Sequence, residues 1–157
     1  MTGWGVVDWQ RGALRHVDCG TVRLPAGDGT AGRLARLYDE ILALIERFAP
    51  SVVAIERNFV ARNVQSAFRL GEARGVILAA VARVGVTVQE VTPAAVKLAA
   101  VGHGAADKAS VTRGVTARLG LAAPPPADAA DALAVALCWL QQAPLQAAIA
   151  RAVRSGA

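Results

Sequence analysis

Three carboxylates lie where this sequence could build a metal-binding site. Glu56 ends the short apolar run 52–55, and Asp128 and Asp131 lie three residues apart at the start of an apolar stretch. The sheets of α/β proteins build ligand sites at the carboxyl ends of such strands, and two acids three apart on a helix share one face. Carboxylate oxygens suit Mg²⁺ or Mn²⁺. We therefore predict that Glu56, Asp128 and Asp131 form a divalent-metal site.

These acids also have ordinary structural interpretations. A glutamate at the end of a strand can point into solvent, and an Asp at a helix N-cap followed by another acid is a common helix-starting arrangement. The stretch 132–140 carries no charge, which indicates a buried helix with carboxylates at the end that could face Glu56. We expect these carboxylates to be buried as well, and buried carboxylates need a cation.

Basic and aromatic residues could complete such a site. Only Lys97 and Lys108 are lysines among the 17 Lys and Arg residues. A compact ammonium suits phosphate contact or charge compensation at a transition state, although both could be ordinary surface residues. Phe59, in a polar and basic segment, could stack on bases while Arg62 and Arg69 contact phosphates, or it could simply cap the core.

The strands and helices that must position these residues are predicted from hydrophobic periodicity and from Gly, Pro and Asp residues at turns and helix ends. The expected strands cover residues 3–7, 14–24, 52–55 and 86–91, the first two forming a hairpin. The expected helices cover 34–48, about 63–84, a short segment from Pro93, a segment capped by Asp107, and a last segment from near Asp128. This order predicts an α/β fold in which helices pack against the sheet.

Length and composition limit the class of protein. At 157 residues and 54% hydrophobic content, the chain can bury one core, so we expect a single domain over 1–157. The formal charge of +5 and the pI near 10.2 favour a polyanionic partner such as nucleic acid. No apolar run approaches the roughly 20 residues needed to cross a bilayer, so we expect a cytoplasmic protein without a membrane partner.

Several segments together resemble the RuvC family, and their order and spacing cover nearly the whole chain. They are TGWGVV at 2–7, AIERNF at 54–59, GEARG at 71–75, VK at 96–97 and ADAADALA at 127–134. The resemblance implies a ribonuclease-H-like mixed sheet with helices on both faces. It also implies a homodimer that makes paired cuts across a four-way (Holliday) DNA junction in recombination and repair, in cooperation with the RuvA and RuvB branch-migration proteins.

The resemblance assigns roles to the residues singled out above. Glu56, Asp128 and Asp131 would be three of four acids that hold two Mg²⁺ or Mn²⁺ ions, one ion activating the attacking water and the other stabilising the leaving 3′ oxygen. Lys97 and Lys108 match functional lysines of the family. The residues expected to bind DNA are Phe59, Arg62, Asn63, Arg69, Arg74, Lys97 and Lys108.

One departure from the family pattern concerns the front of the sequence. Family members open with an apolar strand that ends in an Asp-Pro-Gly-like turn, and that aspartate would bridge the metals, whereas here Met1 directly precedes Thr2. Asp8 lies toward the hairpin turn and is no substitute. A non-catalytic junction-binding protein that lost its first metal ligand is therefore the alternative. Retention of the other three acids favours the nuclease, and a metabolic α/β enzyme lacks support because the sequence has no glycine-rich nucleotide loop.

Overall fold

The structure, a computed structural model, describes residues 1–10, 13–25, 27–57, 63–102 and 106–155. The strands are β1 (Thr2–Gln10), β2 (Ala13–Val22), β3 (Val52–Glu56) and β4 (Thr87–Val91). The helices are α1 (Thr30–Phe48), α2 (Val64–Arg83), α3 (Pro93–Val101), α4 (Lys108–Arg118) and α5 (Ala127–Ser155). Every strand and helix expected from the sequence is present, in the expected order.

The helix boundaries follow local side-chain chemistry. Asn63 and Asp107 each accept a hydrogen bond from the backbone amide three residues later, at 2.8 and 2.7 Å, and so cap α2 and α4. Pro93 occupies the first turn of α3, where its missing amide hydrogen costs nothing. Gly102 ends α3 with a φ of 90°, a left-handed conformation that glycine adopts without strain.

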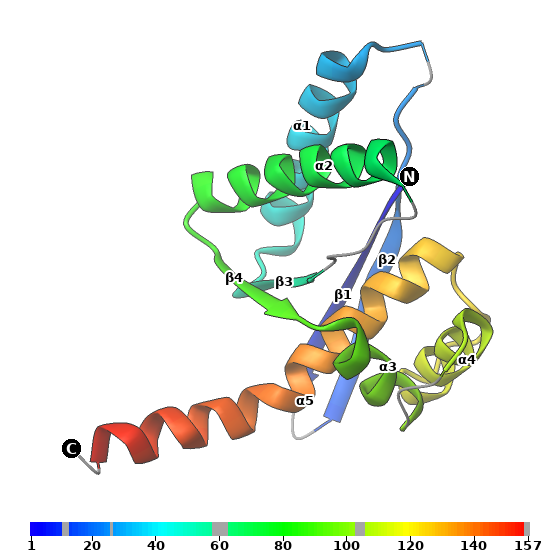
Figure 1. Ribbon diagram of the computed structural model, residues 1–157. Coiled ribbons are helices and arrows are strands. Elements are labelled where there is room, and N and C mark those ends of the chain that lie inside the picture. Colours follow the sequence, from blue (N-terminus) through cyan, green and yellow to red (C-terminus); the bar gives the residue numbers. More distant parts are fainter. Residues whose placement is uncertain (11–12, 26, 58–62, 103–105, 156–157) are drawn as a thin grey trace.

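The strands form two separate ladders. β1 pairs with β2 antiparallel, with a register shift between Val6 and Val7, and β3 pairs with β4 in parallel. The mixed strand directions expected for the fold are therefore present. In the described part of the chain, however, no ladder joins the two pairs. The helix α5 contacts all four strands and so links the two pairs (Figure 1).

Helices cover both faces of the hairpin. Successive residues of a strand point to opposite faces. Gly3 and Gly5 face α5, because an added Cβ at either position would overlap Asp128 or Leu133. Trp4 points the other way and contacts Phe48 at the end of α1, with ring centroids 5.6 Å apart. The predicted arrangement of helices on both faces is confirmed for this part of the sheet.

The largest cluster of buried residues lies where α3 and α4 pack on α5. Leu133, Leu137 and Cys138 on α5 and Val115 on α4 are fully buried there. Burial of each Leu stabilises the fold by about 1.5–3 kcal/mol. This packing fixes the start of α5, which carries Asp128 and Asp131. No described helix is long and apolar enough to span a membrane.

Candidate active site

A cavity of about 1600 Å³ separates β1 from β3. Glu56, at the carboxyl end of β3, and Asp128 and Asp131, in the first turns of α5, all line it. The structure thus brings the three predicted acids to one space from elements about 70 residues apart in the sequence, and it places Glu56 at the strand end that the sequence indicated.

The expectation that these carboxylates are buried is wrong. No charged side chain in the described residues is buried, and 45% of the Asp131 side chain is exposed. The reason is that α5 buries a different face, which carries Ala129, Ala130 and Leu133, while its acids line an open cavity. Solvent therefore shares in stabilising their charge, and burial alone does not force a cation upon them.

The helix-capping interpretation of these acids finds no support in the contacts. The helix begins at Ala127, so Asp128 lies inside its first turn, and the amide of Ala130 donates to the carbonyl of Pro126 at 2.8 Å. Within the described residues, neither Asp128 nor Asp131 accepts a hydrogen bond from a backbone amide. Asp107 shows what such a cap looks like in this chain.

Gly3 allows the backbone of β1 to contact the backbone of Asp128. A Cβ on Gly3 would overlap the carbonyl oxygen and carbon of Asp128, so only glycine lets β1 approach the start of α5 so closely. The sequence showed Gly3 and Gly5 as part of a strand but did not indicate this contact. Two glycines on one face of a strand are the signal that could have revealed it.

The two lysines also line the cavity. The Lys108 ammonium lies 3.2 Å from the Asp131 carboxylate, although 82% of its side chain is exposed. Asp107, directly before it, caps α4, and hydrogen bonding to Ser110 lowers the pKa of Asp107, which keeps a further anion at this edge of the cavity. Lys97 is exposed on α3.

The residues predicted to bind DNA fall into three groups. Arg69 is exposed on α2, while the Asn63 side chain serves as the cap of that helix. Arg74 is turned into the protein, with its side chain 26% exposed. Phe59 and Arg62 lie outside the described residues.

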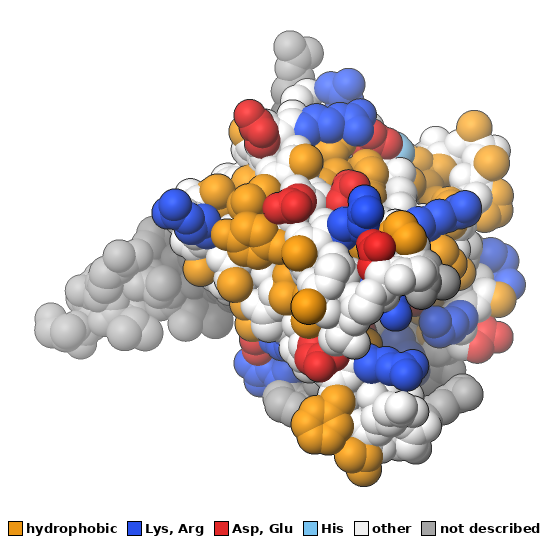
Figure 2. All heavy atoms as spheres, turned by 90° about the horizontal axis from the view of Figure 1, so that it is seen from above, with side chains coloured by type: hydrophobic (Ala, Val, Ile, Leu, Met, Phe, Trp, Pro, Cys, Tyr) orange, Lys and Arg blue, Asp and Glu red, His pale blue; other side chains and the backbone are white. Residues whose placement is uncertain are grey.

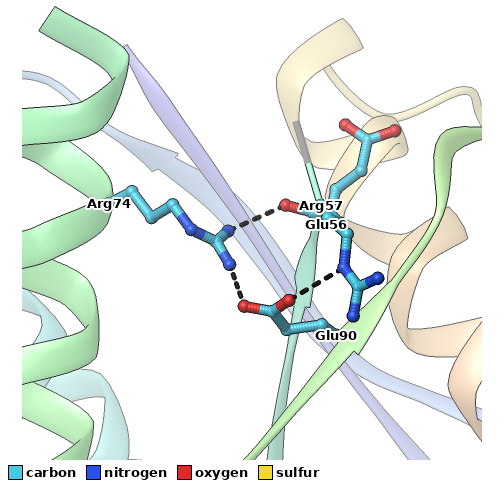
Figure 3. A network of polar contacts seen from close by, with 4 residues as sticks. All are labelled: Glu56, Arg57, Arg74 and Glu90. Atoms are coloured by element: carbon cyan, nitrogen blue, oxygen red, sulfur yellow. Dashed lines mark hydrogen bonds and ion pairs between the residues drawn. The ribbon is translucent and has the colours of Figure 1, made fainter. Parts of the chain in front are cut away.

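Arg74 belongs to a polar network that the sequence did not predict (Figure 3). Its Nη1 donates to the backbone carbonyl of Glu56 at 2.9 Å, and its Nη2 forms an ion pair with Glu90 of β4. The other Glu90 oxygen lies 3.0 Å from Nε of Arg57. Hydrogen bonding to Arg57, supported by the charge of Arg74, lowers the pKa of Glu90.

The donor chemistry of the cavity fits a divalent cation, because all three predicted ligands are carboxylates. Their spacing is wider than that of one closed site. Within the described residues, no three acidic, His or Cys side chains are close enough to bind one ion together. The three acids therefore line a shared space without enclosing an ion among themselves.

Comparison with known proteins places this geometry in a family. The family model described as crossover junction endodeoxyribonuclease RuvC matches residues 1–139. The chain belongs to the RuvC family. A RuvC of Chloroflexus aurantiacus is 46% identical over 143 residues, which are 90% of this chain and 87% of that protein. A RuvC of Alkalilimnicola ehrlichii is 46% identical over 152 residues, with 97% and 92% covered.

Solved RuvC structures resemble the chain throughout. The Thermus thermophilus RuvC structure has a TM-score of 0.81 and 34% identity, covering 92% of this chain and 89% of that one. The T. thermophilus RuvC in complex with a Holliday junction substrate has a TM-score of 0.84 and the same identity, with 92% and 88% covered. The RuvC resemblance and the ribonuclease-H-like fold are thereby confirmed. The family is one of nucleases by its name.

Proposed function

We propose that this protein resolves four-way DNA junctions by paired, metal-dependent phosphodiester hydrolysis. The observation that carries the proposal is the shared cavity of Glu56, Asp128 and Asp131 in a member of the RuvC family. A relative with 34% identity is described as a complex with a Holliday junction substrate, which supports the choice of DNA substrate.

The proposed chemistry divides between bound ions and the chain. Two Mg²⁺ or Mn²⁺ ions would supply Lewis acidity and a hydroxide-like water. Glu56, Asp128 and Asp131 would hold them through hard oxygen donors. Lys108, already beside Asp131, and Lys97 stand at the same cavity, where an ammonium could bind the phosphate and balance charge that develops on it.

We further propose that an additional β-strand fills the cavity between β1 and β3 and so joins the β1–β2 ladder to the β3–β4 ladder. In the described residues, β1 and β3 each pair along one edge only, and both line the cavity between the ladders. Unpaired strand edges tend to recruit another strand. A strand there would join the two ladders of the single domain 1–157 into one mixed sheet, and its end could bring a fourth ligand between the three acids.

The surface of α2 supports the proposed homodimer. Val64 and Phe68 on this helix are 72% and 69% exposed, and Leu70 and Val84 are also exposed. Figure 2, which views the molecule from the side of α1 and α2, shows hydrophobic side chains at the surface among charged ones. Exposed apolar groups of this kind are typical of association surfaces, and paired cuts need two sites.

DNA would bind along the face that leads from α2 to the cavity. Arg69, Lys97 and Lys108 would contact phosphates, and Phe59 with Arg62 would approach the bases as the sequence predicts. The side chain of Asn63, which caps α2, would orient this segment. RuvA and RuvB remain the partners proposed for the assembled reaction.

A second candidate is a junction-binding protein without catalysis. One observation favours it, namely that no three described ligands are close enough to bind an ion together. The two candidates predict the same binding preference for junctions and differ only in cleavage.

The experiment measures binding and cleavage of a four-way junction beside a linear duplex of equal length. The 157-residue chain is compared with a version that carries an added apolar strand ending in Asp. We expect both versions to prefer the junction, with Mn²⁺-dependent cleavage by the extended version and weak cleavage by the shorter one. Equal affinity for the linear duplex contradicts the proposal, and junction binding without cleavage by either version favours the second candidate.

A further inference from the structure

Arg74 joins three elements at the end of β3. From α2 its guanidinium reaches the carbonyl of Glu56 and the carboxylate of Glu90 on β4. Arg57 holds the second oxygen of Glu90, and the amide of Arg57 donates to the carbonyl of Val91 at 2.7 Å. Both polar groups of the peptide unit that joins Glu56 to Arg57 are thus hydrogen-bonded. We name Arg74, Glu90 and Arg57 the strand-end clamp.

The clamp and the Glu56 carboxylate lie on opposite faces of the β3–β4 ladder. Ile55 pairs with Glu90 and Glu56 with Val91, so Glu90 and Glu56 belong to alternate positions that point to opposite faces. Figure 3 agrees with this, because the Glu56 side chain extends away from the clamp. The backbone is therefore gripped from one face while the carboxylate projects from the other.

We propose that Arg74 and Glu90 are positioning residues that fix Glu56 for metal binding. This inference rests on the proposed function, in which Glu56 is a ligand. A strand end is anchored by fewer ladder bonds than a strand centre, and the carboxylate of Glu56, the last residue of β3, moves with its backbone. By holding the Glu56 carbonyl, Arg74 restricts that movement, and Glu90 holds Arg74 in the required orientation through a charge-assisted bond.

The contacts of the Arg74 guanidinium favour this positioning role over the alternative, in which Arg74 binds DNA. Both terminal nitrogens of its guanidinium are already engaged within the protein. Contact with a phosphate would have to replace the ion pair with Glu90. Arg69, exposed five residues earlier on α2, can take that role without disturbing the clamp.

The test uses Arg74→Met, Arg74→Lys and Glu90→Gln in the full chain, with Arg83→Met as a matched control. Arg83 is exposed in the last turn of the same helix, outside the clamp. The first readout is Mn²⁺ affinity without DNA, from the electron paramagnetic resonance signal of free Mn²⁺. The second is the separation of kcat from KM for junction cleavage by the version with the added strand.

We expect Arg74→Met to weaken Mn²⁺ binding by about 10-fold or more, as loss of a group that orients a ligand commonly does. The kcat should fall with it while KM for the junction stays near that of the unchanged protein. Arg74→Lys keeps the charge but cannot make both contacts, so it should restore part of the affinity. Arg83→Met should change neither quantity.

Three outcomes would overturn the inference. Unchanged Mn²⁺ affinity in Arg74→Met, with affinity lost in Glu56→Gln, removes the positioning role and leaves the proposed function intact. A raised KM at constant kcat makes Arg74 a DNA contact. If Arg74→Met does not fold, unchanged affinity in both Arg74→Lys and Glu90→Gln decides against the clamp. Unchanged affinity in Glu56→Gln would instead refute the proposed metal site itself.

Discussion

The ion pair between Lys108 and Asp131 explains how an acidic side chain can line the cavity with little loss of folding stability. Lys108 lies 3.2 Å from Asp131, and both side chains reach solvent, so the charge of Asp131 is balanced without burial. An exposed ion pair of this kind contributes at most about 1 kcal/mol to folding. Lys108 can therefore leave Asp131 at little cost when a stronger cation or a phosphate competes for either partner.

Glu90 gives the clamp a defined dependence on pH. Its pKa is lowered, chiefly by hydrogen bonding to Arg57, so the folded protein holds the ionised form more strongly than the unfolded chain does. The resulting stabilisation is present above the ordinary Glu pKa of about 4.3 and is lost as pH falls through the lowered folded value. We expect Glu90→Gln to reduce the melting temperature near pH 7, and this difference should disappear in acid. A difference that persists below pH 3 in thermal melts would contradict the assignment.

At the scale of elements, the contact between β1 and α5 brings Asp128 to the cavity. The contact depends on Gly3, whose Cα faces the Asp128 backbone without room for a side chain. A rigid approach of this kind fixes where the first turn of α5 stands relative to the strand. It also makes the position of one proposed ligand depend on a residue near the opposite end of the sequence.

Gly3→Ala should separate β1 from the start of α5. Because backbone atoms would have to move, we expect a loss of about 1–3 kcal/mol in the free energy of unfolding together with weaker Mn²⁺ binding. Gly27→Ala is the control, since an added Cβ there has no neighbour within 4 Å. Urea denaturation of both variants measures the effect. Equal stability of the two would show that the close approach does not exist.

In a second element, α2, an added methyl group should raise stability, whereas at Gly3 it should lower it. A Cβ on Gly75 meets nothing within 4 Å, so Gly75→Ala should stabilise an isolated helix by about 0.5–1 kcal/mol. If α2 forms the dimer interface, the same change should weaken dimerisation by filling a close helix–helix contact. Sedimentation equilibrium and thermal melts at low concentration separate the two effects. A more stable monomer with unchanged dimerisation would place the interface elsewhere.

The sequence predicted elements better than it predicted contacts. Asn63, Asp107 and Gly102 mark helix ends through local bonds, so their neighbours in sequence suffice to find them. The clamp between Arg74 and Glu90 depends on how α2 lies over β4, which no local pattern encodes. The solvent exposure of Asp131 was not predicted either. An apolar helix indicates that the helix is buried, but it does not show which of its faces remains open to solvent.

At the scale of the whole molecule, the basic charge on one face is distributed instead of gathered in one patch (Figure 2). Lys and Arg side chains are interspersed with Asp and Glu on the face seen in Figure 2, although the net charge is +5. Affinity for DNA should therefore come from a limited number of phosphate contacts near the cavity, with counterion release as its driving force.

Junction affinity should fall steeply as salt concentration rises. We expect Arg69→Ala to reduce the slope of log affinity against log salt by about one, the amount expected for one lost phosphate contact. Arg15→Ala, at the turn end of the hairpin, should leave the slope unchanged. Fluorescence anisotropy between 50 and 200 mM salt measures both slopes. Equal slopes for both variants would show that the DNA does not contact Arg69 on α2.

The most direct test of the account is single-turnover junction cleavage by Glu56→Gln, Asp128→Asn and Asp131→Asn at saturating protein. Each change is made in the version with the added strand, keeps the shape of the side chain and weakens a hard-metal ligand. We predict that cleavage falls by about 100-fold or more while junction affinity stays within a factor of about two. Cleavage that survives Asp128→Asn and Asp131→Asn, with only about 1 kcal/mol of stability lost, would contradict the proposed site and leave these acids as helix-starting residues.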